Sequence, residues 1–141
     1  MADQLPLFST QPERTGAEPA PPREAALAAE GLRSSSPLQA AIVAWREHLE
    51  SQRSSPHTVK AFAGDLNLFA DFIGAGRSLG EISTRDLNQW LDWQRTVKKA
   101  SPKTYARRVT SLKSFFRWLT RAGVIANDPA ISAALNDLHA R

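Results

Sequence analysis

The 141-residue sequence contains no cysteine, which excludes a disulfide framework and any thiolate metal site. Its three histidines, His48, His57 and His139, stand too far apart to suggest a metal-binding cluster, so we expect no metal and no other cofactor. The chain also lacks an apolar run of about 18 residues and the features of a signal peptide. These absences predict a soluble, cytoplasmic protein with no membrane partner.

Acidic residues are missing from the stretch between Trp93 and Asn127, although the whole chain has a net charge of only +4. This stretch carries nine basic residues: Arg95, Lys98, Lys99, Lys103, Arg107, Arg108, Lys113, Arg117 and Arg121. Such segregation raises the local positive potential and favours a polyanionic partner such as nucleic acid. The alternative interpretation is a solvated helix face without a ligand.

The composition divides the chain into a tail and one domain. Residues 1–35 hold five of the nine prolines and few apolar residues after Phe8, so they are predicted to form a disordered, Pro/Ala-rich tail. Residues 36–130 have the apolar content of one modest domain. Residues 131–141 are a short C-terminal extension.

Four helix starts are predicted within the domain, at Ser36, Ser55, Ser83 and Ser101, because serine is a preferred N-cap. Proline follows the first, second and fourth of these serines, at the position where a helix tolerates it best. Apolar residues recur with helical spacing after each start, and no segment alternates with a period of two. An all-α domain of four helices is therefore expected.

The second helix carries apolar residues on two sides near its end. Leu66 and Phe69 belong to its main stripe, whereas Leu68 and Phe72 fall on the opposite side. The end of this helix is therefore expected to be central to the fold.

The fourth predicted helix pairs an apolar stripe, centred on Leu112 and Phe116, with a basic and hydroxyl-bearing face. Lysine and arginine bind phosphates, and arginine and short hydroxyl side chains also reach base edges in the major groove. The start of the second helix adds a small, lightly basic surface next to Ala61 and Gly64. The candidate DNA-binding residues are His57, Lys60, Lys99, Lys103, Thr104, Arg107, Ser111, Ser114, Arg117 and Arg121, of which Thr104, Arg107 and Ser111 are the candidates for base reading.

An ordered set of short motifs resembles the core-binding domain of tyrosine recombinases, the phage-integrase and chromosome-dimer-resolution enzymes. The set comprises the helix start at Ser55, the run Ser101-Pro102-Lys103-Thr104, the run Phe115-Phe116-Arg117-Trp118-Leu119, Gly123-Val124-Ile125 and Asn127-Asp128-Pro129-Ala130. The resemblance implies a four-helix, SAM-like orthogonal bundle that clamps one side of a recombination half-site. It also implies that the second and fourth helices face the major groove of duplex DNA.

The family's catalytic tyrosine, arginines, lysine and histidines belong to a larger domain that would begin after Ala130. The single tyrosine of this sequence, Tyr105, lies in the apolar stripe and is predicted to be structural. We therefore expect no catalytic residue and no enzymatic activity from this chain alone. Its partners would be a recombinase catalytic domain or other recombinase protomers.

Two alternatives to a DNA-binding module remain. In the first, the chain is a truncated or split site-specific recombinase. In the second, it is a helical protein-interaction adaptor. The second alternative depends on Trp93 and Trp118, which lie off the apolar stripes and would serve as interface anchors if they were exposed and contiguous.

The tail contains one further motif, Gln4-Leu5-Pro6-Leu7-Phe8. It resembles the short peptides with which bacterial proteins bind the replicative sliding clamp. The resemblance implies that Gln4, Leu5, Leu7 and Phe8 fill an apolar pocket of the clamp when the tail orders on binding.

Overall fold

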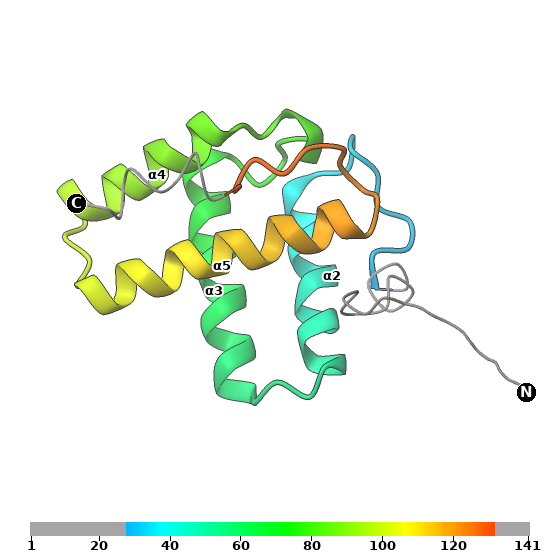
Figure 1. The fold of residues 1–141 in the computed structure, drawn as a ribbon, viewed down its shortest axis with the longest axis horizontal. Helices are drawn as coiled ribbons and strands as arrows, with labels where there is room; N and C mark the ends of the chain where they lie inside the picture. Colours follow the sequence, from blue (N-terminus) through cyan, green and yellow to red (C-terminus); the bar gives the residue numbers. More distant parts are fainter. Residues whose placement is uncertain (1–27, 132–141) are drawn as a thin grey trace, which may run out of the picture.

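The computed structural model describes residues 28–131, which form four α-helices and one short 3-10 helix (Figure 1). These are α2 (Leu38–Ser51), α3 (Pro56–Ile73), η2 (Leu79–Glu81), α4 (Thr84–Thr96) and α5 (Pro102–Arg121). No strand occurs between residues 28 and 131, and an isolated bridge pairs Pro37 with Ser78. The predicted all-helical, four-helix fold is therefore confirmed. None of the helices in this range is long and apolar enough to cross a membrane.

The helices α2 and α3 lie side by side, and α5 crosses in front of both of them (Figure 1). The helix α4 packs against α3 and α5 and runs back to the start of α5 through a short loop. The core lies where α5 crosses the other helices. Its largest fully buried side chains include Trp45, Phe69, Trp90, Phe115 and Phe116, which come from all four helices.

Three of the four predicted serine caps are present. The Ser55 and Ser101 hydroxyls accept hydrogen bonds from the backbone N–H groups of Thr58 and Thr104, at 3.1 and 3.2 Å. Ser83 and Asp86 form a reciprocal capping box at the start of α4. Each cap satisfies an amide that a helix start leaves unpaired, so these starts were readable from local sequence.

The first start was predicted wrongly, because Ser36 does not cap α2. The N-cap position is Pro37, which makes no side-chain cap hydrogen bond. The first amides of α2 instead bond to the loop after α3: Leu38 N donates to Arg77 O at 2.8 Å, and Gln39 N donates to Ala75 O at 3.0 Å. A tertiary contact thus replaces the local cap.

The end of α5 fixes the direction in which the chain leaves the bundle. Gly123 has a φ of 80°, and Val124 N donates to Leu119 O at 3.0 Å. Together with the bond from Gly123 N to Thr120 O, this contact makes a Schellman motif, whose positive φ favours glycine. Val124 and Ile125 then return to the core, where both are buried.

Two expectations about packing need correction. The packed region begins before residue 36, since Ala29 is buried and Leu32 packs against the core. The end of α3 is not enclosed on all sides, because Leu68 and Phe72 are 44% and 39% exposed. Their side of α3 is only partly covered, by the contact of the Phe72 ring with Trp93 of α4 at 5.0 Å.

Candidate nucleic-acid interface

A shallow groove of about 500 Å³ lies between the first half of α3 and α5. Its lining includes His57, Lys60 and Arg107, together with the small residues Ala61 and Gly64. A Cβ atom placed on Gly64 would meet nothing within 4 Å, so the groove is open beside this residue. The groove therefore combines positive charge with room for a ligand to approach the backbone of α3.

A buried carboxylate, Asp65, lies at the inner side of this groove and is only 1% exposed. Arg107 donates to it twice, from Nε to Oδ2 at 2.9 Å and from Nη2 to Oδ1 at 2.6 Å. Ser111 Oγ donates to Oδ2 at 2.7 Å, and Arg108 Nε lies 3.4 Å from Oδ1. Arg108 in turn donates to the side-chain oxygen of Gln94, which is also buried.

This cluster ties together three helices, since Asp65 lies on α3, Gln94 on α4 and the two arginines on α5. The carboxylate that accepts the hydrogen bonds of Arg107 raises the pKa of that guanidinium, against the opposing effect of its partial burial. Two cations share one anion, so the cluster keeps a net positive charge. It thus satisfies a buried carboxylate and supplies positive charge to the groove.

The prediction that Ser111 reads a base is therefore wrong. It is completely buried, and its hydroxyl is engaged by Asp65. The apolar face of α5 is wider than the predicted stripe, because Asp65 of α3 covers Ser111 and His48 of α2 stacks on the buried ring of Trp118. On a helical wheel, Ser111 and Trp118 lie about 20° apart at one border of that face.

The other candidate residues are solvent-accessible but do not form one patch. Lys99, Lys103, Arg117 and Arg121 are exposed, whereas Thr104 and Ser114 are half-buried. At a rise of about 1.5 Å per residue, Arg117 and Arg121 lie roughly 15 and 21 Å along α5 from Arg107. The groove therefore brings together His57, Lys60 and Arg107, and leaves Arg117 and Arg121 on the far half of α5.

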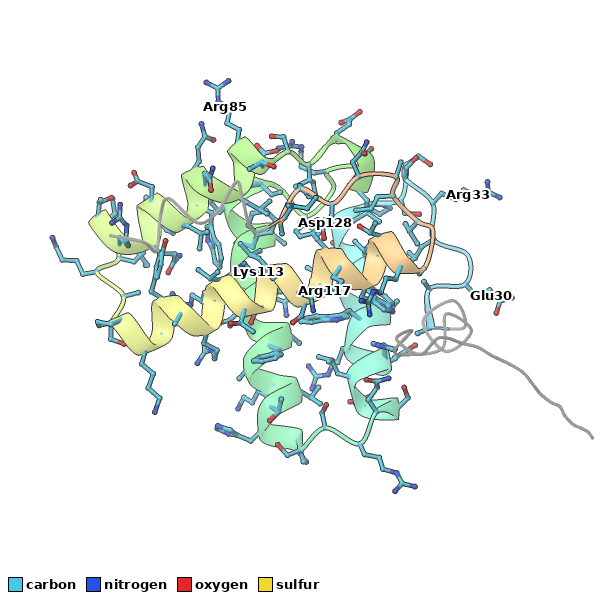
Figure 2. The ribbon with its side chains drawn as sticks, in the orientation of Figure 1. Glu30, Arg33, Arg85, Lys113, Arg117 and Asp128 are labelled. Atoms are coloured by element: carbon cyan, nitrogen blue, oxygen red, sulfur yellow. The ribbon has the colours of Figure 1, made fainter. Side chains whose placement is uncertain are left out.

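Figure 2 shows Lys113 and Arg117 on the front of α5, the side turned away from α2 and α3. Thr110 is exposed on the same helix. We define this surface, made by Thr110, Lys113, Arg117 and Arg121, as the outer face of α5. Lys113 is one of the nine basic residues of the acid-free stretch but is not among the predicted DNA-binding residues.

The residue that sequence reasoning missed is Asp65. A signal was present, because Asp65 follows Phe62 by three residues and precedes Phe69 by four, which places a carboxylate on an apolar helix face. A charge in that position is rarely buried without a partner. The cluster of arginines in the fourth helix supplies the partner.

The two tryptophans proposed as interface anchors do not form an exposed pair. Trp118 is buried, and its ring stacks on His48 of α2 at 5.4 Å. Trp93 is half-buried between Phe72 and Lys98, whose Nζ lies 5.3 Å from the ring centroid. This arrangement contradicts the observation on which the adaptor interpretation depended. Tyr105 is buried in the core, as predicted.

Residues 42–123 match the family model of the phage integrase N-terminal SAM-like domain. The chain belongs to this family. It is 35% identical over 91 residues to a tyrosine recombinase XerC from Roseiflexus sp., and 37% identical over 95 residues to XerC from Mycobacterium tuberculosis. It is 33% identical over 79 residues to a tyrosine recombinase XerD from Listeria innocua. No match to a solved structure was found.

As a SAM-like core-binding domain of the tyrosine recombinase family, the chain matches only part of its relatives. The alignments cover 62%, 66% and 55% of this chain, but 29%, 32% and 27% of the Roseiflexus, Mycobacterium and Listeria proteins. The matched region is thus about a third of each recombinase. The catalytic region of the relatives is not covered.

Proposed function

We propose that this domain binds duplex DNA through the groove between α3 and α5, as the core-binding part of a tyrosine recombinase system. The observation that carries the proposal is the convergence of Lys60, His57 and Arg107 on one groove, with Lys103 exposed on the same half of α5. The helix α5 contributes six basic residues and no acidic one. Family membership supports the same partner.

The physical basis of binding is the exchange of counterions for protein cations along the phosphate backbone. Lys60 and Lys103 are exposed and form no ion pair within residues 28–131, so they supply charge at low cost. The outer face of α5, with Arg117 and Arg121, extends the positive surface beyond the groove. We propose that the groove is the primary contact and the outer face the secondary one.

Recombination by the assembled system is a separate part of the proposal. Strand cleavage and joining would use a catalytic domain supplied with this domain or by a separate protein, together with other protomers on the same DNA. The bound DNA would then be a recombination half-site. With DNA as its partner, the protein would act in the cytoplasm.

A charge-matched pair of variants tests the DNA contact. The first variant, Lys60→Ala with Lys103→Ala, removes two cations from the groove region. The control, Arg33→Ala with Arg85→Ala, removes two exposed cations that project away from α5 (Figure 2). Both variants change the net charge equally, so any difference between them reports on position.

The measurement is the affinity for a 30-base-pair duplex, by fluorescence anisotropy, between 50 and 200 mM salt. Each neutralised phosphate contributes about 0.9 to the slope of log affinity against log salt, so the groove variant should lose about 1.8 from that slope. The control should bind with the slope of the wild type. Equal losses in the two variants, or no DNA binding by the wild type at low salt, would contradict the proposal.

A further inference from the structure

We infer that Asp65 is a positioning residue that holds Arg107 so that the outer edge of its guanidinium recognises a guanine in the major groove. The inference rests on the proposed function and adds a base preference to it. The groove, the buried carboxylate and the two-point contact between Asp65 and Arg107 carry the argument.

The pairing leaves one edge of the guanidinium available. Arg107 uses Nε and Nη2 to bind the two oxygens of Asp65. An arginine has five N–H donors in a fixed plane, so both hydrogens of Nη1 and one of Nη2 remain unused by this contact. The unused edge offers two parallel donors. The Arg107 side chain is 40% exposed and lines the groove.

The partner that holds Arg107 is itself fixed. Asp65 is almost completely buried and receives further hydrogen bonds from Ser111 and Arg108. Arg108 is restrained in turn by the buried side chain of Gln94. Arg107 therefore starts from a single orientation, and less conformational freedom is lost when its outer edge binds a ligand.

Two parallel donors in a plane match two kinds of acceptor pair in DNA, the O6 and N7 atoms of guanine and two oxygens of a phosphate. The pairing of Arg107 with Asp65 favours guanine. Asp65 offsets much of the charge of Arg107, which weakens attraction to a phosphate but leaves the direction of the two N–H bonds unchanged. The small residues Ala61 and Gly64 line the same groove and leave room for a base edge.

The experiment begins with selection of preferred sites from a random duplex library by the wild-type domain. Each guanine of the selected site is then replaced singly by 7-deazaguanine, which removes the N7 acceptor and leaves the phosphates unchanged. At one position this replacement should weaken wild-type binding roughly 5- to 150-fold, the usual discrimination of a bidentate contact.

Two variants test the roles of the residues. Arg107→Lys keeps the charge but lacks the fork, so it should bind all duplexes with the wild-type salt slope and lose the effect of 7-deazaguanine at that position. Asp65→Asn should lose the same discrimination, because an NH2 group replaces one carboxylate oxygen and cannot accept a hydrogen bond from Arg107. Arg85→Ala is the control: it removes an exposed cation that projects away from α5 and should keep the discrimination.

Circular dichroism and thermal melting establish that each variant is folded before its binding is compared, and Arg107→Lys decides the matter if Asp65→Asn does not fold.

Three outcomes would overturn the inference while leaving DNA binding intact. One is a selected site without a 7-deazaguanine effect, and another is full discrimination by Arg107→Lys. The third is a salt slope that falls by about 0.9 in Arg107→Ala with no base effect, which would assign Arg107 to a phosphate. Failure of the wild type to bind any duplex would instead contradict the proposed function.

Discussion

Replacing Asp65 with alanine should strongly destabilise the domain, because this carboxylate is the shared acceptor of Arg107, Arg108 and Ser111. The two arginines differ in what they lose. The Arg107 side chain is 40% exposed, so in the variant its guanidinium can be solvated by water. The Arg108 side chain is only 17% exposed, so its guanidinium would stay partly desolvated. Removal of one partner from a buried pair costs about 3 to 5 kcal/mol.

The Ser111 hydroxyl adds to this cost, since a buried hydroxyl without its acceptor is unfavourable by about 1 to 3 kcal/mol. Solvation of the freed Arg107 guanidinium by water reduces the cost. We therefore expect a loss of about 3 to 5 kcal/mol in the free energy of unfolding of Asp65→Ala. This loss is a large fraction of the roughly 5 to 15 kcal/mol that stabilises an ordinary domain.

Urea unfolding followed by tryptophan fluorescence measures the effect. With an m value of about 1.5 kcal/mol per M, the midpoint should fall by about 2 to 3 M. Ser111→Ala should cost about 1 kcal/mol in the wild type but should stabilise the Asp65→Ala background, where it removes a buried hydroxyl that has lost its acceptor. A cost below about 1 kcal/mol for Asp65→Ala, or equal costs of Ser111→Ala in both backgrounds, would refute the reasoning.

Three further predictions follow from other parts of the chain. Phe116→Ala should lower the free energy of unfolding by about 3 to 5 kcal/mol in the same urea assay, because Phe116 is fully buried where α5 crosses the core. Burial opposes the ionisation of Asp86, but bonds from Ser83 and Arg77 outweigh it and lower the pKa of the carboxyl. Its contribution is present above the unfolded-state pKa and lost as the pH falls through the folded-state pKa, so the deficit of Asp86→Asn in thermal melts at pH 7 should shrink below about pH 4. A peptide of residues 1–10 should bind a bacterial sliding clamp in an anisotropy assay, and Leu7→Ala with Phe8→Ala should abolish the signal; this motif lies outside the described residues.

The helices were predictable wherever the decisive interactions are local. Ser55, Ser83 and Ser101 each bond to an amide three residues ahead, so the sequence alone contains both partners. Ser36 failed because the partners of the first amides of α2 lie in the loop at residues 75–77, almost 40 residues away. A serine before a proline is the same local signal in both situations, and only the tertiary contact distinguishes them.

The site was less predictable, for a geometric reason. A helical wheel centred on the apolar stripe assumes that one face of α5 is covered and the opposite face is free. Three helices, α2, α3 and α4, pack on α5 from different directions, so the covered sector extends to Ser111 and Trp118. The basic residues were found correctly, since charge is a property of the sequence, but their separation into a groove and an outer face depends on where α3 passes.

The position of Arg107 at the border of the covered sector links the stability of the domain to its proposed binding. Lys60 and Lys103 are exposed, so each is replaceable at little cost to folding, and DNA affinity alone should register the change. Arg107 both satisfies a buried carboxylate and lines the groove. Arg107→Ala should therefore change stability and base preference together. Arg107→Lys should retain the charge and lose the two-point contact. A variant that restored stability by replacing Asp65, Arg107 and Ser111 with packed apolar residues should fold and yet lose base preference, which would separate the two roles of the cluster.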